Sequence, residues 1–168
     1  MKPYRQFGYL GTFASNELNK VAEKIKEKIK HYSNDKDDRF SFIMNLDKSN
    51  QPGSHWVAVY IDPSFDRSLE YFDSFGDSPT EEFMKDIKKV INVLDPETYL
   101  KFKVNKIKQQ RVNSDNCGYF AMFFLIKRYE GEPFSKITKY DEMEKRVTNK
   151  SEKEIKAFKK MLPKFKII

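Results

Sequence analysis

Apolar residues recur along this chain with two different spacings, and the spacings predict a mixture of helices and strands. Where apolar residues lie three or four positions apart, a helix with one buried face is indicated. Where β-branched and aromatic residues follow one another without such gaps, a buried strand is indicated. The pattern predicts helices over 15–32, 78–94 and 151–162 and strands over 40–46, 56–62, 69–74 and 100–107.

Polar residues that can cap a helix stand at the start of each predicted helix. Ser15 precedes the first, and Ser78 and Ser151 each stand three residues before a glutamate, which is the pattern of a capping box. Pro79 suits the first position of the second helix. We therefore expect these serines to be the caps, with Asp95-Pro96 and Pro163 ending the second and third helices.

The order of these elements predicts an α+β fold, because helices and strands do not alternate as regular βαβ units. We expect a central mixed sheet flanked by helices. The chain has 168 residues, of which 39% are hydrophobic and 15% aromatic, enough for one core. No repeat or long linker divides it, so residues 1–168 are expected to form a single domain.

The only cysteine of the chain stands between a polar run and an apolar one. Residues 113–116 are turn-forming, Cys117 follows, and 119–126 are continuously apolar, which indicates a buried helix. A cysteine in the first turn of a helix meets free N–H groups and the positive end of the helix dipole, and both favour the thiolate. Gly118 beside it allows the backbone of another chain to approach closely.

A thiolate nucleophile needs a base, and the chain has two histidines. His31 lies in a lysine-rich helical run, whereas His55 begins a predicted strand and Asp73 ends the next one. Neighbouring strands can bring both to one edge of a sheet, where the carboxylate would orient the imidazole. The side-chain amide of Gln109 or Gln110 could donate to an oxyanion formed at the cysteine.

Each of these residues also has an ordinary interpretation. A lone cysteine is commonly a small buried side chain, a lone histidine is commonly structural, and an aspartate after a strand commonly starts a turn. What favours catalysis is that all of them occur in one order, each at the boundary of an element. A non-enzymatic basic binding module with an inert Cys117 remains the opposing hypothesis.

The same residues resemble a known family. His55-Trp56, an acid about one hairpin later and the segment 110–118 look like the adenovirus-type maturation cysteine proteases, whose clan includes the SUMO-specific proteases. The acid lies in 71–76, similar to that branch's acid-x-Phe-Gly segment, and 9–13 resembles a further family segment. The resemblance extends from about residue 9 to residue 129.

The resemblance implies a circularly permuted papain-like fold and a site with the chain order His55, Asp73, Gln110, Cys117. It further implies cleavage of viral precursor proteins after glycine or small residues during particle maturation, in a virion of a virophage or related DNA virus and in the host-cell cytoplasm. A SUMO-type isopeptidase is the alternative within the clan, and an acyltransferase relative is less favoured. This chain departs from the pattern in its aspartate and its short length.

Basic charge is the second signal in the sequence. The formal net charge is +7, and residues 101–111 contain five cations and no anion. Such a stretch suits a phosphate backbone, and the resemblance adds that adenovirus-type proteases use DNA as a cofactor. Solvated lysine-rich faces are common, however, and no base-reading motif is present. The candidate DNA contacts are Lys101, Lys103, Lys106, Lys108 and Arg111.

The remaining expectations rest on features that the sequence lacks. With one cysteine, no intramolecular disulfide can form, and a disulfide-linked activating peptide would consume Cys117. No apolar leader or membrane-spanning run is present, so we expect an unsecreted protein without a membrane partner. No zinc-ligand spacing or nucleotide loop appears. We expect a monomer that needs no cofactor for its chemistry.

Overall fold

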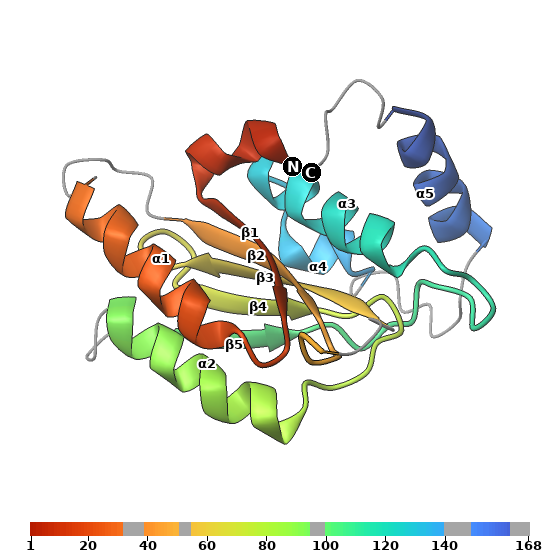
Figure 1. The fold of residues 1–168 in the computed structure, drawn as a ribbon. Coiled ribbons are helices and arrows are strands. Elements are labelled where there is room, and N and C mark those ends of the chain that lie inside the picture. Colours follow the sequence, from red (N-terminus) through yellow and green to blue (C-terminus); the bar gives the residue numbers. More distant parts are fainter. Residues whose placement is uncertain (32–38, 51–54, 95–99, 140–148, 162–168) are drawn as a thin grey trace.

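The computed structural model describes residues 1–31, 39–50, 55–94, 100–139 and 149–161, and these form one mixed β-sheet with helices on both faces (Figure 1). The strands are β1 (Tyr9–Ala14), β2 (Phe40–Asn45), β3 (Trp56–Asp62), β4 (Ser68–Phe72) and β5 (Lys101–Val104). The helices are the 3-10 helix η1 (Lys2–Phe7) and α1 (Leu18–His31), α2 (Glu81–Leu94), α3 (Cys117–Tyr129), α4 (Phe134–Ile137) and α5 (Asn149–Met161).

The five strands lie in the order β1-β2-β3-β4-β5. The inner pairs, β2 with β3 and β3 with β4, are antiparallel, whereas the outer pairs, β1 with β2 and β4 with β5, are parallel. This arrangement confirms the expected α+β fold with a central mixed sheet. It also means that the start of β3 and the end of β4 meet at the same edge of the sheet.

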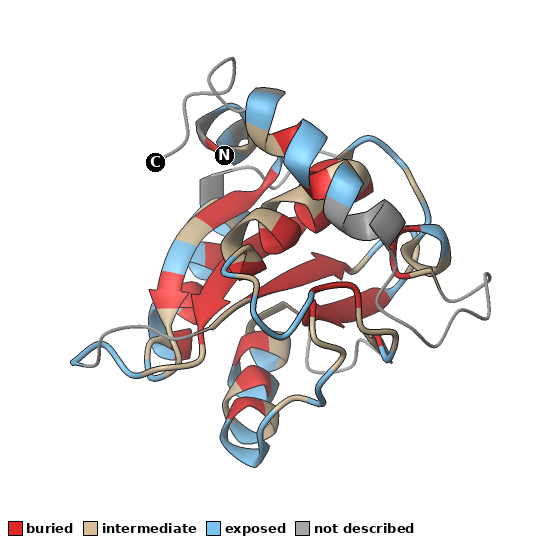
Figure 2. Ribbon diagram, turned by 90° about the vertical axis from the view of Figure 1, so that its right-hand side faces the viewer, coloured by how far each residue is buried: buried red, intermediate tan, exposed pale blue. Residues whose placement is uncertain are grey.

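The sheet separates two hydrophobic cores. Val57, Val59 and Ile61 of β3 face the core shared with α1 and α2, whereas Ala58 and Tyr60 face the core shared with α3 and α5. Side chains alternate across a strand, so a strand covered on both faces must be apolar at nearly every position. This explains the unbroken apolar run of β3, which is buried along its whole length after Trp56 (Figure 2).

None of the three predicted serine caps, Ser15, Ser78 and Ser151, stands directly before its helix. The second helix begins at Glu81, and the hydroxyl of Thr80 accepts the N–H of Phe83 at 3.1 Å, so Thr80 takes the place expected for Ser78. The third predicted helix begins at Asn149, which places Ser151 inside it. Several polar residues stood together at each of these sites, and pattern alone does not choose among neighbours that can all cap.

Other helix and strand boundaries also differ from the predicted ones by a few residues. The first helix begins at Leu18, and the N–H of Ser15 bonds instead to the carbonyl of Asp47, at 3.0 Å. The fifth strand ends at Val104 rather than at residue 107. The expected stop signals at 95–96 and 163 lie outside the described residues. Among the helices described, none is long and apolar enough to cross a membrane.

Candidate active site

Two of the predicted site residues meet at one edge of the sheet. His55 directly precedes β3 and Asp73 directly follows β4, and these strands are antiparallel, with Ala58 opposite Phe72. Nε2 of His55 lies 2.7 Å from Oδ1 of Asp73. This is the distance of a charge-assisted hydrogen bond, in which the carboxylate orients the imidazole ring.

The backbone of Asp73 is held by a residue that follows the neighbouring strand. Asn105, which follows β5 and is fully buried, accepts the N–H of Asp73 at 2.8 Å and donates to its carbonyl at 2.5 Å. Oδ1 of Asp73 also accepts the N–H of Phe75, at 2.8 Å. Because Asn105 bonds both backbone groups of Asp73, it fixes the position of the acid beyond the last hydrogen bonds of the sheet.

A glycine turns the chain sharply after this acid. Gly76 has φ of +73°, and a Cβ atom there would stand 2.7 Å from the carbonyl oxygen of Lys106. Only glycine adopts this conformation without strain at so close an approach. The turn after Asp73 is thereby packed against the segment that leads from β5 to the nucleophile.

Cys117 is the first residue of α3, as predicted, and is 9% exposed. The helix packs across β3 on the face opposite α1 and α2 (Figure 1). A Cβ atom on Gly118 would lie 3.7 Å from the indole of Trp56, so the first residue of β3 lies directly against the first turn of α3. This packing brings the thiol to the edge of the sheet that holds His55.

The pKa of the thiol is lowered and the pKa of the imidazole is raised, and both shifts favour an ion pair between them. Burial opposes the charged form of Cys117, but the interaction with His55 and the backbone N–H groups of Trp56 and Gly118 together lower the pKa of the thiol. Burial likewise opposes the charged form of His55, but interactions with Asp73 and Cys117 raise its pKa from 6.5 to about 9. Both shifts favour a thiolate beside an imidazolium.

The two nitrogens of the imidazole ring differ in their contacts. Nε2 faces Asp73, and the buried Nδ1 has no hydrogen-bond partner within bonding distance among the described residues. The thiol nevertheless raises the pKa of His55, so the imidazole and Cys117 are close enough to interact electrostatically. On one side the ring stacks on Phe75, with centroids 4.9 Å apart.

The two glutamines before the cysteine have different surroundings. Gln110 is fully buried: its Oε1 accepts the hydroxyl of Ser74 at 2.5 Å, and its Nε2 donates to the carbonyl of Ser114 at 2.6 Å. Gln109 instead donates from Nε2 to the carbonyl of Ile137, at the end of α4. Gln110 is thus bonded to the residue after Asp73 and to the loop before the nucleophile, whereas Gln109 ties that loop to α4.

The five candidate DNA-binding cations follow the edge of the sheet toward the site. In β5, Lys101 pairs with Ser68 and Lys103 with Glu70, and the chain then passes Asp73. The amino group of Lys108 lies 5.4 Å from the centre of the Phe75 ring that stacks on His55. Lys101, Lys106 and Arg111 are exposed.

Three residues at the site had no part in the sequence prediction: Asn105, Ser74 and Phe75. Asn105 and Ser74 follow strands and look like ordinary turn residues, so a single sequence gives no signal that distinguishes them. Phe75 lies in the Phe-Gly segment of the family resemblance, which is a signal that was available. The described residues hold no cluster of three or more acidic, histidine or cysteine side chains that could bind a metal ion.

A thiolate, an imidazolium, a buried carboxylate and an oriented amide are the groups that nucleophilic acyl transfer requires. The comparisons with known proteins agree with this chemistry. The model of the Ulp1 protease family, C-terminal catalytic domain, matches residues 6–162. The chain belongs to the Ulp1 protease family. This is the SUMO-protease side of the clan that the sequence resembles.

Its relatives among curated proteins are viral. A provisionally named thiol protease of Acanthamoeba polyphaga mimivirus is 37% identical over 97 residues, which is 56% of this chain and 32% of the relative. A protein of African swine fever virus, isolate Warthog/Namibia/Wart80/1980, named a SUMO-1 cysteine protease, is 27% identical over 79% of this chain and 46% of its own. The chain therefore spans less than half the length of these relatives.

Solved structures share the fold. The crystal structure of the African swine fever virus protease covers 92% of this chain and 61% of its own, with a TM-score of 0.60 and 18% identity. The SUMO protease Ulp1 with its cysteine oxidised to a sulfonic acid covers 95% of this chain and 71% of its own, with a TM-score of 0.57 and 17% identity. The expected papain-like fold is thereby confirmed.

Proposed function

We propose that this chain is a cysteine protease domain in which Cys117 attacks a peptide carbonyl and His55 carries the proton. The observation that carries the proposal is the 2.7 Å bond between His55 and Asp73 at the sheet edge that receives the start of α3. The raised pKa of His55 and the lowered pKa of Cys117 support a thiolate that is ready to react. The same shifts argue against an inert buried thiol.

Catalysis would proceed in two steps. The thiolate bonds to the carbonyl carbon, the charge passes to the carbonyl oxygen, and the free N–H of the Gln110 amide and the backbone N–H of Cys117 stabilise it. As the carbon–nitrogen bond breaks, His55 protonates the leaving amine. A water then gives a proton to His55 while its oxygen attacks the thioester, and the thiolate leaves.

The substrate in this proposal is a viral precursor protein, cleaved after glycine or another small residue during particle maturation, as in the adenovirus-type branch. Trp56 packed on Gly118 supports a narrow passage beside the nucleophile. The sites of action would be the virion and the host-cell cytoplasm. A SUMO-type isopeptidase is the second candidate, favoured by the name of the swine fever virus relative.

The experiment compares cleavage of a Gly-Gly peptide and of a reporter ending in a ubiquitin-like modifier. Cys117→Ala and His55→Ala should each abolish cleavage, because the two groups act as a unit, while His31→Ala serves as the matched histidine control. If either variant keeps more than a few per cent of wild-type activity, the proposed site is wrong. Preference for the modifier reporter would select the isopeptidase.

We also propose that duplex DNA activates this enzyme without covalent attachment. The cations from Lys101 to Arg111 lead along β5 toward the site, and Lys108 contacts the ring that stacks on His55. A phosphate backbone bound there would order the loop before Cys117. Stimulation should fall steeply as salt rises from about 50 to 200 mM, because released counterions set the affinity. Equal rates with and without DNA at the lowest salt would reject this role.

A further inference from the structure

A cleft begins at the end of the sheet opposite His55, beside the β3–β4 hairpin. It encloses about 860 Å³ between the β3–β4 hairpin, β5 and the segment around α4. Its lining includes Tyr60 and Asp62 at the end of β3, six residues beyond Trp56, which is roughly 20 Å along a strand. The cleft extends from this hairpin end toward Lys106, whose carbonyl packs against Gly76 in the turn after Asp73. A group bound at the hairpin end therefore lies away from the reacting atoms.

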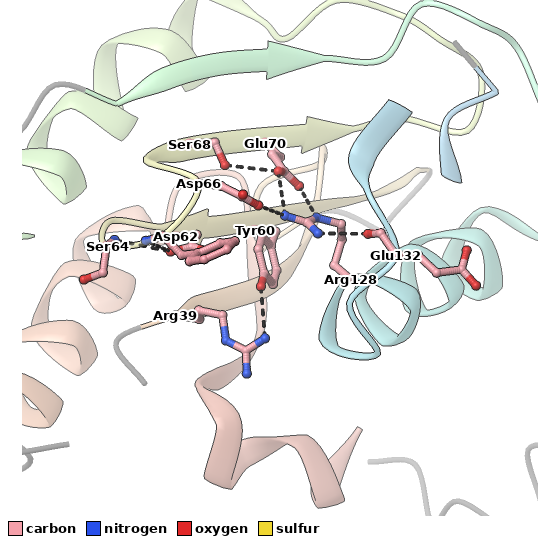
Figure 3. A network of polar contacts seen from close by, with 10 residues as sticks. Arg39, Tyr60, Asp62, Ser64, Asp66, Ser68, Glu70, Arg128 and Glu132 are labelled. Atoms are coloured by element: carbon pink, nitrogen blue, oxygen red, sulfur yellow. Dashed lines mark hydrogen bonds and ion pairs between the residues drawn. The ribbon is translucent and has the colours of Figure 1, made fainter. Parts of the chain in front are cut away.

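One wall of the cleft is fixed by a buried ion network (Figure 3). Arg128 is 5% exposed, donates from Nε and Nη2 to Glu70, and also donates to Asp66 at 2.6 Å. Its Nη1 donates to the carbonyl of Glu132 at 2.9 Å, and its guanidinium lies 4.6 Å from the centre of the Tyr60 ring. Arg128 is thus engaged with the protein itself, and it holds the hairpin, the sheet and the end of α3 in a preformed shape.

The rim of the cleft is apolar and accessible. Phe65, at the tip of the β3–β4 hairpin, is 89% exposed, and Phe102 of β5 is 40% exposed. Two of the five exposed large hydrophobic side chains in the described part of the chain therefore border this one cleft. Exposed aromatic side chains gathered at a concave surface mark a place where another apolar group binds.

The remaining charges of the lining are mainly positive. Arg39, Lys103 and Lys106 line the cleft together with Asp62, whose carboxylate already accepts the backbone N–H groups of Ser64 and Phe65. Neither Lys103 nor Lys106 forms an ion pair with a described carboxylate. Burial raises the pKa of Glu70, and the charge of Lys103 partly offsets this increase. An acidic ligand complements this surface.

We propose that this cleft is an exosite that binds an acidic segment of the protein substrate, with one apolar side chain between Phe65 and Phe102. The proposal rests on the proposed protease function and adds to it a second point of recognition. Because the hairpin end of the cleft is roughly 20 Å from the site, the apolar side chain bound there must stand at least six residues from the scissile bond, since an extended chain spans at most about 3.6 Å per residue. The exosite would lower KM for long substrates and leave kcat unchanged.

The test uses Gly-Gly peptides of four designs. The first is short. The second carries the segment Asp-Glu-Phe-Asp-Glu after a Gly/Ser linker of 12 residues, whose mean span is about 20 Å. The third carries the same segment with lysines and glutamines in place of the acids. The fourth has a linker of three residues, which reaches at most about 11 Å. Each tailed peptide is made with the tail on either side of the scissile bond.

The acidic tail on the long linker should lower KM at least tenfold relative to the short peptide in one of the two orientations, with kcat unchanged. Lys103→Glu and Phe65→Ser should each reduce this advantage to less than twofold. Lys88→Glu and Ile29→Ser, at exposed positions of α2 and α1 on the opposite face of the sheet, should keep it. For each variant, KM for the tailed peptide is compared with that variant's own KM for the short peptide.

The exosite would be overturned if the acidic tail did not lower KM, or if it lowered KM equally in Lys103→Glu. It would also be overturned if the tail on the three-residue linker lowered KM as much as the tail on the long linker. An increase in kcat on the short peptide when the free acidic segment is added would likewise overturn it, because the cleft would then bind a separate activator. Binding of the fluorescein-labelled segment to Cys117→Ala, followed by anisotropy, tests the cleft independently of catalysis. Displacement of that label by duplex DNA, with no tail advantage, would overturn the exosite and leave Lys103 and Lys106 to the DNA proposed above to bind along β5.

Discussion

Gln110 offers the sharpest separation of catalysis from folding in this protein, because its neighbour Gln109 is also buried and also hydrogen-bonded. The amide nitrogen of Gln110 has two N–H groups, of which one donates to Ser114. The hydroxyl of Ser74 fixes the other end of the amide. The second N–H is thereby oriented before the substrate arrives, as an oxyanion donor must be.

The expected magnitudes follow from these contacts. Gln110→Ala should lower kcat about 100- to 1000-fold, or roughly 2.7–4 kcal/mol in the transition state, with little change in KM. Ser74→Ala removes one neutral hydrogen bond to the amide, worth about 1 kcal/mol, and should lower kcat about fivefold. Gln109→Ala should leave kcat within a few-fold of wild type, because its amide donates to Ile137.

Both glutamine variants leave buried partners without a hydrogen bond, which costs about 1–3 kcal/mol of stability for each unsatisfied group. The assay therefore measures kcat and KM on a short Gly-Gly peptide well below the thermal midpoint of each variant, together with the midpoint itself. Equal loss of stability with unequal loss of kcat is the expected result. Comparable kcat for Gln110→Ala and wild type, or an equal fall in kcat for Gln109→Ala, would refute the assignment of the donor.

Three further predictions concern the same site. Because the pKa of Cys117 is lowered and that of His55 is raised, the rate of Cys117 alkylation by iodoacetamide should begin to rise at a lower pH than for an ordinary cysteine thiol. The part of stability that comes from charged His55 should be complete below about pH 6.5 and lost as pH rises through about 9, and Asp73→Asn should shift this loss to lower pH. A stability profile that is identical in Asp73→Asn would contradict the pairing. Asn105→Ala should lower kcat and also cost about 1–3 kcal/mol, because it frees the backbone of Asp73 in a buried place. The surface variant Asn16→Ala is the control, and equal unfolding midpoints for the two would contradict this role.

Much of the fold followed from local pattern, because helix and strand periods are properties of short segments. The unbroken apolar run of β3 indicated a buried strand. The change from polar to apolar residues at 113–119 indicated a helix that begins at the cysteine. Helix starts were less certain. Thr80 and Ser78 both can cap, and the choice depends on how the preceding turn leaves the sheet.

Local sequence placed particular residue types at the ends of particular elements: a histidine before one strand, an aspartate after the next and a cysteine at a helix start. Only the tertiary structure decided that these ends meet, through the antiparallel pairing of β3 with β4 and the packing of α3 across β3. It also decided the roles of Asn105, Ser74 and Arg128, whose bonds join residues 32, 36 and 58 positions apart. The physical reason is that secondary structure is encoded in neighbours, whereas a hydrogen bond between distant segments exists only after the sheet and its helices have brought both partners out of water.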